Sequence, residues 1–361
     1  MPKESEPGDR ELELLIAIDP TKKDLLAGDD YSKYVAGLFY DEEGREVQFP
    51  FSKFTGKAYT VLGTSGSGKS SFVRSFIYFV LLPFKYQFSI FDVEGEYYKL
   101  ADRFPDQIQL WDERLKASDA ERLAREAILG LKSTIIDCSN SSMAEFTVFA
   151  YEYLENLWHF ADILRHDYEM NMPHMCILEE AQELAKQWPN KDNPFEIDAL
   201  DTIKKYARRG RKYGPAIMLV SQRIPAMNIE AVSQTQIKFL LKTNADVDRT
   251  RYRGWLSIGE KAINIAMNQM KPGQVIIYEG KVKRDEFGNV ELPVYSYSYL
   301  EWADVSQSVV PSDILRLENF IKANRDELAA KFNREKLLHP PIKRRARNEI
   351  IAPAKASKKT R

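Results

Sequence analysis

The chain has 361 residues, of which 44% are hydrophobic and 29% charged, and its net charge is −1. This length and balance predict a soluble globular protein of one large domain with appendages, or of two domains. The near-zero net charge gives no indication, by itself, of a protein that binds nucleic acid.

Residues 1–56 are predicted to form a short β-rich segment. The first residues are charged and lack the apolar stretch of a secretory signal. Leu14–Ile18 is predicted to be a strand, and Tyr34–Tyr40 and Glu46–Phe51 are predicted to form a hairpin around the turn at 41–44. The two cysteines, Cys138 and Cys176, lie in apolar runs, which favours core positions in a reducing compartment and a cytoplasmic location.

Residues 57–300 alternate short apolar runs with helical patterns, which is typical of a parallel sheet covered on both faces. No apolar run reaches the ~18–20 residues that span a bilayer, so no membrane span is expected. The predicted strands are Ala58–Leu62, Gln87–Phe91, Thr134–Asp137, Met175–Leu178, Ala216–Ser221, Phe239–Lys242 and Gln274–Tyr278, followed by a hairpin turning at Gly288-Asn289. The predicted helices are Ser71–Leu82, Ala117–Gly130, Met143–Met170 and Asp198–Arg209.

Residues 301–338 are predicted to form a C-terminal helical segment, with the helix starting at Pro311-Ser312-Asp313. One face of this helix is apolar: Ile314, Leu317, Phe320, Ile321, Leu328 and Phe332. Residues 339–361 carry eight Lys or Arg against one acid, Glu349, which predicts a basic disordered tail. Two interpretations of this tail stay open: it contacts nucleic acid, or it is a plain solvated terminus.

Residues 63–70 read Gly-Thr-Ser-Gly-Ser-Gly-Lys-Ser, a full match to the P-loop pattern, between a predicted strand and a predicted helix. Glycines let the backbone N–H groups surround a polyphosphate, and the helix N-terminus favours its negative charge. A glycine-rich turn matching by chance is the alternative, which this context disfavours. The nucleotide-binding residues are predicted to be Gly63, Thr64, Ser65, Gly66, Ser67, Gly68, Lys69, Ser70 and Ser71, with Lys69 on the phosphates and Ser70 on Mg²⁺.

The run Met175–Leu178 leads into two acids, Glu179 and Glu180, and resembles a Walker B strand. Glu179 is predicted to support the metal, through water because of its extra methylene compared with Asp. Glu180 is predicted to orient and activate the attacking water. The plainer alternative is a strand that meets a helix N-terminus, where acids are favourable.

A second polar feature lies between residues 204 and 222. Gln222, at a strand tip, suits a sensor of the γ-phosphate or of water. Before it stands a basic cluster of Lys204, Lys205, Arg208, Arg209, Arg211 and Lys212. A solvated face, a patch for nucleic-acid phosphates and an arginine finger for a neighbouring subunit all fit this cluster.

Together these motifs resemble the HerA/FtsK superfamily of P-loop motors, closest to its HerA-like branch, over most of residues 57–280. Further matching motifs stand at 92–97 (DVEGEY), 135–139 (IIDCS), 179–182 (EEAQ), 210–214 with 220–223 (GRKYG and VSQR) and 271–274 (KPGQ). The resemblance implies a RecA-like core that hydrolyses ATP with Mg²⁺ in a homohexameric ring and translocates double-stranded DNA. Carried over by position, Lys69 and Ser70 bind phosphate and metal, Glu179 supports the metal, Glu180 is the base, Gln222 the sensor and Arg211 the trans finger. Arg208 and Arg209 are less favoured as fingers.

One departure is the length before the motor, about 56 residues where HerA proper has a sizeable β-barrel. The strands within Leu14–Phe51 are expected to form a reduced version of it, which puts the usual nuclease partner in doubt. A viral genome-packaging or conjugative DNA pump shares the same motor and is the first alternative. A nucleotide-dependent scaffold is the second, although such a protein would not need Glu180, Gln222 and Arg211. A small-molecule kinase is disfavoured, because the paired acids suit water attack.

Overall fold

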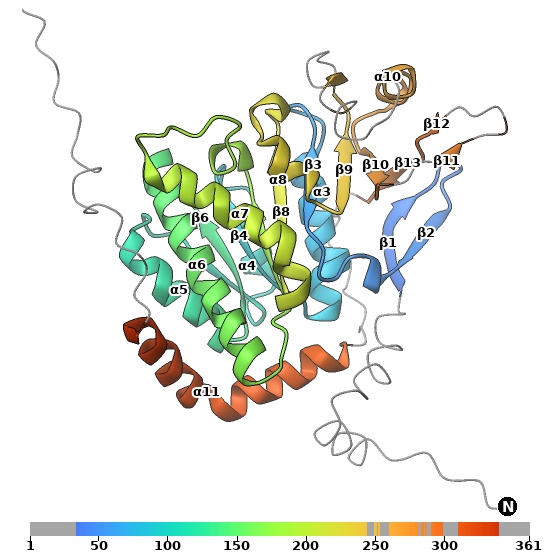
Figure 1. Cartoon of the computed structure of the whole chain (residues 1–361). Helices are drawn as coiled ribbons and strands as arrows, with labels where there is room; N and C mark the ends of the chain where they lie inside the picture. Colours follow the sequence, from blue (N-terminus) through green and yellow to red (C-terminus); the bar gives the residue numbers. More distant parts are fainter. Residues whose placement is uncertain are drawn as a thin grey trace, which may run out of the picture.

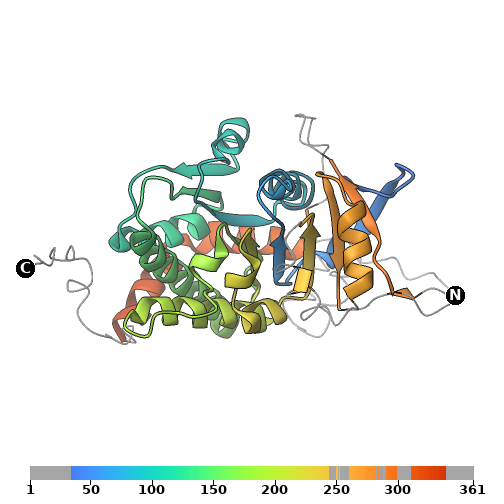
Figure 2. The same cartoon turned by 90° about the horizontal axis from the view of Figure 1, so that it is seen from above.

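The computed structural model describes residues 34–243, 249–250, 252, 260–280, 283–284, 286, 290–298 and 310–338. The described chain is built on an 11-stranded sheet in the order β2-β1-β13-β10-β9-β3-β8-β7-β4-β6-β5. Helices cover both faces of this sheet (Figures 1 and 2). The predicted α/β fold, a mostly parallel sheet flanked by helices, is therefore confirmed. None of the described helices combines the length and apolar character that crossing a bilayer requires.

The larger part of the sheet is parallel. Its strands, in spatial order, are β9 (Ile237–Leu241), β3 (Tyr59–Leu62), β8 (Pro215–Ser221), β7 (His174–Leu178), β4 (Gln87–Asp92), β6 (Ser133–Asp137) and β5 (Ile108–Trp111). Every residue of β3, β7, β8 and β9 is buried, as expected for strands covered on both faces. The apolar runs therefore predicted all of these strands except β5.

The remaining part of the sheet is antiparallel. It consists of β10 (Gln274–Tyr278), β13 (Val294–Tyr297), β1 (Tyr34–Tyr40) and β2 (Glu46–Pro50). The predicted hairpin is confirmed as β1–β2, but it does not form the expected reduced barrel, because β1 pairs with β13 and extends the main sheet. Burial explains this placement, since Phe39 of β1 packs against Phe72, in the helix after the glycine-rich loop, and against Phe239 of β9. The predicted strand Leu14–Ile18 and the basic tail lie outside the described residues.

A short second sheet stands beside the antiparallel edge. It pairs β11 (Lys283–Arg284) with β12 (Val290–Glu291), which confirms the arms of the late hairpin. Its turn at Gly288-Asn289 lies outside the described residues. The boundaries of the four predicted segments of the chain stay a prediction.

Each strand sends alternate side chains to opposite helical layers. In β7, Cys176 and Leu178 face one core cluster, whereas Met175 and Ile177 face the other. The first layer contains α5 (Ala117–Leu129), α6 (Met143–Asp167), α7 (Pro194–Tyr213) and α8 (Ile229–Ser233). The second contains α3 (Lys69–Phe76), a π-helical turn (Ile77–Leu81) and α4 (Tyr98–Arg103). Helix α10 (Glu260–Gln269) covers the antiparallel strands.

Helix α11 (Ser312–Leu338) runs along the amino ends of the parallel strands (Figure 1). It buries the predicted apolar face, with Ile321, Leu328 and Phe332 at most 1% exposed. Both cysteines are buried and free, as expected from their apolar surroundings.

Helix α7 differs from its prediction at both ends. It begins at Pro194, capped by the Asn193 side chain, and it continues past Gly210 to Tyr213. Gly210 is needed for close packing rather than for stopping the helix, because a Cβ there would lie 2.1 Å from the carbonyl oxygen of Pro215. The residue that ends the helix is Gly214, which has φ +109°. Arg211 therefore lies in the last helical turn, and not after the helix as expected.

His174, the first residue of β7, is buried, and we expect it to make the fold less stable in acid. Its Nε2 lies 2.8 Å from Ser89 Oγ, and burial lowers the pKa of His174 to about 3 from its ordinary value of 6.5. The unfolded chain therefore binds the proton more readily, so the stability contribution is complete above pH 6.5 and is lost as the pH falls towards 3. Between pH 7 and pH 5 we expect the free energy of unfolding to fall by about 2 kcal/mol through this residue.

Denaturant unfolding at pH 5, 6 and 7 measures this loss. In His174→Gln the slope of the free energy of unfolding against pH should correspond to the uptake of about one proton fewer on unfolding. The matched control is His166→Gln, since the His166 side chain is 63% exposed and should leave the slope unchanged. An unaltered slope in His174→Gln would show that another group causes the acid sensitivity.

Candidate nucleotide-binding and hydrolysis site

The P-loop connects the carboxyl end of β3 to the first turn of α3, as predicted. Gly66 and Gly68 have φ of +74° and +94°, a left-handed conformation that glycine adopts without strain. The loop is held by the neighbouring strands, because Gly63 N donates to Ser221 O (3.4 Å) and Thr64 N donates to Lys242 O (3.3 Å). Helix α3 then begins at Lys69, so its N-terminus points at the space that the loop surrounds.

Lys69 lies at the centre of the charged groups of this site. Its Nζ donates to Thr64 O (3.1 Å). Burial lowers the pKa of Lys69, while the nearby carboxylates of Glu180 and Glu179 act in the opposite direction. The acids of the predicted Walker B strand are thus close enough to the P-loop lysine to interact with its charge.

Glu179 is a nearly buried carboxyl group, with 6% of the residue exposed. Burial raises the pKa of Glu179 to about 8, and a hydrogen bond from the Tyr97 hydroxyl to its Oε1 (2.5 Å) opposes that rise. Tyr97 is itself held by Asp92, whose Oδ2 accepts from the Tyr97 backbone N–H (2.9 Å). The motif at 92–97 therefore connects the end of β4 to the end of β7.

The donor set fits Mg²⁺. This ion takes oxygen ligands, often one or two carboxylates together with substrate phosphates and water. The P-loop hydroxyl of Ser70 and the carboxylate of Glu179 are such donors, and a cation beside the buried Glu179 would favour its charged form. Within the described residues no group of three or more His, Cys, Asp or Glu side chains could hold a metal by itself.

Glu180 and Gln222 lie side by side at the ends of the adjacent strands β7 and β8. Gln222 Nε2 donates to Glu180 Oε1 (2.9 Å). Glu180 has φ +45° and ψ +43°, a conformation that is unfavourable for a residue with a Cβ and that is found where surrounding contacts impose it. The predicted base and the predicted sensor are thus brought together beside the P-loop.

Arg211 is not part of this cluster. It precedes β8, whose amino end lies at the opposite edge of the sheet from the P-loop, and it packs near Gly56. The basic cluster around it is partly neutralised: Lys204 and Arg208 pair with Glu230, and Lys205 pairs with Glu155. Arg209, Arg211 and Lys212 are exposed and form no ion pair within the described part of the chain.

Three residues that contact this site were given no role by sequence reasoning, although Gln182 and Ser221 stand in motifs that it noted. The Tyr297 hydroxyl, from β13, donates to Gly68 O (2.7 Å) and fills the space that a Cβ at Gly68 would need. Gln182 and Ser221 contact each other next to Glu180, at 2.6 Å between Gln182 Oε1 and Ser221 Oγ. Local pattern predicts none of these contacts, because each joins strand ends that only the folded sheet brings together.

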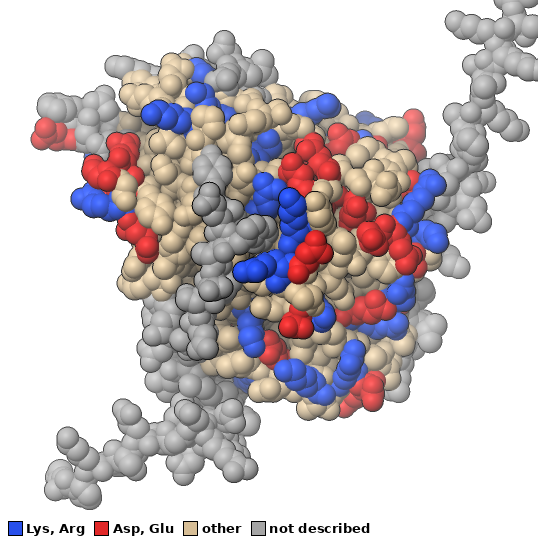
Figure 3. Space-filling model, turned by 180° about the vertical axis from the view of Figure 1, so that it is seen from behind, with Lys and Arg blue, Asp and Glu red and all other residues tan. Residues whose placement is uncertain are grey.

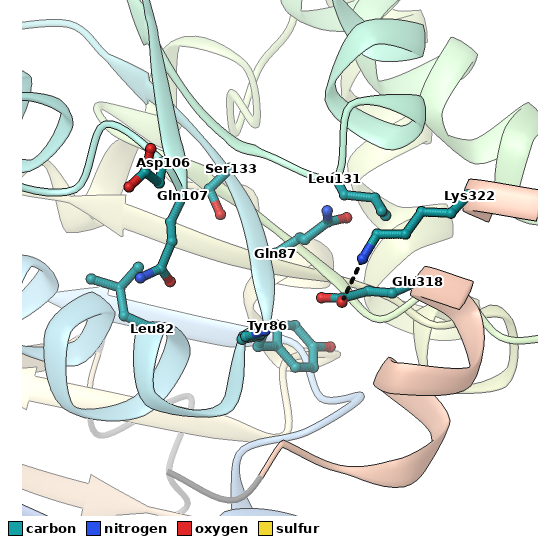
Figure 4. A pocket seen from close by; sticks show the side chains of 10 residues that line it. Leu82, Tyr86, Gln87, Asp106, Gln107, Leu131, Ser133, Glu318 and Lys322 are labelled. Atoms are coloured by element: carbon teal, nitrogen blue, oxygen red, sulfur yellow. Dashed lines mark ion pairs between the residues drawn. The ribbon is translucent and has the colours of Figure 1, made fainter. Parts of the chain in front are cut away.

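The described chain also has a small cavity of about 200 Å³ at the amino ends of β4 and β6, next to α11 (Figure 4). Gln87 and Ser133 line it from the strands, and the Lys322–Glu318 ion pair (3.7 Å) lines it from the helix. It is smaller than the usual ~300–1,000 Å³ of ligand pockets. It lies at the opposite edge of the sheet from the P-loop, so it is not the nucleotide site.

Two solved structures with TM-scores above 0.5, VirB4 and EccC, show the same fold. VirB4 of Thermoanaerobacter pseudethanolicus matches with a TM-score of 0.53 and 13% identity, over 73% of this chain and 96% of that one. The cytoplasmic domain of the type VII secretion ATPase EccC of Thermomonospora curvata gives 0.51 and 16%, over 82% of this chain and 32% of that one. The genome-packaging NTPase B204 of Sulfolobus turreted icosahedral virus 2 gives 0.43 and 16%, over 66% and 96%. No curated protein sequence matches the chain.

The family comparison covers more than half of the chain. Residues 34–245 match the family model described as "Helicase HerA, central domain". The match begins at β1 and includes the P-loop, both Walker B acids and Gln222. The chain therefore belongs to the HerA central-domain family and is a P-loop ATPase of the HerA/FtsK type.

Proposed function

We propose that this ATPase is a homohexameric motor in the cytoplasm that uses MgATP to translocate double-stranded DNA. The observation that supports it best is the arrangement at the ends of β3, β7 and β8. There a P-loop lysine, a buried acid and a second acid held by Gln222 lie around one site. A carboxylate next to the γ-phosphate site suits activation of water, and therefore turnover rather than static binding.

Family membership supports DNA as the partner, and the charge distribution suggests how it is bound. Figure 3 shows Lys and Arg interspersed with Asp and Glu on one face, without a large patch of a single sign. Duplex binding through such a surface would be weak. A closed ring would instead hold the duplex in a channel lined by loops of several subunits, so that modest contacts from each subunit add up.

The test measures both the turnover of ATP and the movement of the protein along DNA. Wild-type ATPase activity is expected to rise several-fold with linear duplex DNA, and ATP should drive displacement of a triplex-forming strand from the duplex. Lys69→Ala, which lacks the phosphate-binding ammonium, is the control and should do neither. ATP turnover that ignores DNA, together with no triplex displacement, would contradict a DNA motor. Light scattering with ATP and Mg²⁺ tests the hexamer, which a strictly monomeric active protein would overturn.

A further inference from the structure

Gln182 is a buried side chain, 3% exposed, that contacts the proposed catalytic base from the side opposite Gln222. Its Nε2 donates to Glu180 Oε2, while Gln222 Nε2 donates to Glu180 Oε1. Each oxygen of the Glu180 carboxylate thus receives one amide N–H. Two donors on separate oxygens fix the plane of the carboxylate, and each oxygen keeps a further acceptor site.

Ser221 determines which way the Gln182 amide faces. The Ser221 hydroxyl accepts from the Arg223 backbone N–H (3.1 Å), so its own proton is available for Gln182 Oε1 (2.6 Å). With its oxygen occupied in this way, the amide must present its NH₂ group to Glu180. The chain of contacts therefore runs from the end of β8, through Ser221 and Gln182, to the carboxylate at the end of β7.

The backbone of Glu180 needs such support. The Glu180 backbone has φ +45°, a region that is unfavourable for a residue with a Cβ, and the surrounding structure must hold it there. The Glu180 carboxylate lies near enough to the P-loop to raise the pKa of Lys69, against the lowering caused by burial. Contacts that keep this geometry matter for a base, because a general base acts only within hydrogen-bond reach of the proton that it removes.

We infer that Gln182 and Ser221 are positioning residues for ATP hydrolysis, which hold the Glu180 carboxylate in the orientation that activates water. The inference rests on the proposed hydrolytic function. Neither residue is assigned a contact with nucleotide, metal or water. Gln182 acts on Glu180 directly, and Ser221 acts through Gln182.

The main test is Gln182→Met, which preserves side-chain length and removes both hydrogen bonds. Its kcat should fall by about 10- to 100-fold, on the order of what a ~1 Å misplacement of a catalytic group costs. KM and the Kd for ATP should stay within about twofold, because the P-loop is untouched. Gln182→His supplies a ring N–H and should recover most of the rate. Gln187→Met, a glutamine of the same strand-exit segment whose Oε1 accepts from Ile229 N, is the matched control and should retain the wild-type kcat.

A double-mutant cycle separates positioning from a merely structural role. If Gln182 acts through Glu180, adding Gln182→Met to Glu180→Gln should lower kcat no further. Ser221→Ala should show a smaller loss of kcat with the same lack of additivity. Additive losses, or a wild-type kcat in Gln182→Met, would overturn the inference. A wild-type protein that fails to hydrolyse ATP would instead refute the proposed function, so the two failures are distinguishable.

Discussion

Glu180→Gln should still bind ATP but hydrolyse it about 10²–10⁴-fold more slowly, the range that a general base contributes. The amide has nearly the same shape as the carboxylate, so the fold and the P-loop should be unaffected. It can no longer accept the proton of the attacking water. Binding of labelled ATP and steady-state turnover measure the two effects, and we also expect an ATP-loaded variant that holds DNA longer than the wild type.

Lys69→Ala gives the contrasting outcome. The Lys69 ammonium lies within the P-loop and contacts Thr64 O, so its removal should weaken ATP binding and turnover together. Gln187→Met, outside the network around Glu180, should leave binding and turnover unchanged. Turnover near the wild-type rate in Glu180→Gln would mean that another group activates the water.

Arg211→Ala tests the arginine finger and carries the largest expected effect, about 10³–10⁵-fold in turnover. Arg211 lies before the amino end of β8, and the P-loop lies beyond the carboxyl end of the adjacent β3. The seven residues of β8 alone span about 23 Å at 3.3 Å per residue. Arg211 therefore cannot reach the phosphates bound to its own chain, and a role in hydrolysis requires a neighbouring subunit.

Mixing variants tests that requirement. Arg211→Ala and Lys69→Ala subunits should each be nearly inactive alone. Mixed rings should recover part of the activity, because some interfaces then pair an intact P-loop with an intact Arg211. Arg208→Ala is the matched control, since Arg208 is engaged by Glu230 and Gln234 and should retain most turnover. Mixed rings that form but stay inactive at every ratio would favour a structural or DNA-contacting role for Arg211.

The sequence predicted the strands of the parallel core well, because burial on both faces requires apolar residues at consecutive positions. Strands such as β7 and β8 are continuous apolar runs, and turn signals separate them from the helices. β5 was missed because it is the edge strand of the parallel side, where only Ile108 of its four residues is buried. The end of α7 was misplaced because glycine serves both close packing and helix termination. Gly210 serves the first purpose and Gly214 the second.

For the site, the motifs predicted the residues for which we propose chemical roles, but not the residues that contact them. Lys69, Glu179, Glu180 and Gln222 were all predicted, and the fold brings them together. Tyr97 was noted only as part of a motif, and its hydrogen bond to Glu179 joins residues 82 positions apart. Gln182 and Ser221 stood in matching motifs but were given no role, since their contact depends on the pairing of β7 with β8. Such contacts follow from strand order, which local patterns do not encode.

The hydrogen bond from Tyr297 to Gly68 has a consequence for the order in which the protein matures during synthesis. The two residues are 229 positions apart. A nascent chain thus completes its P-loop sequence long before the ribosome adds the hydroxyl that contacts it. A chain ending at residue 245, where the family match stops, would carry the P-loop, the Walker B acids and Gln222 but would lack β10 and β13. Nucleotide would therefore meet a finished binding loop only after β13 has been synthesised.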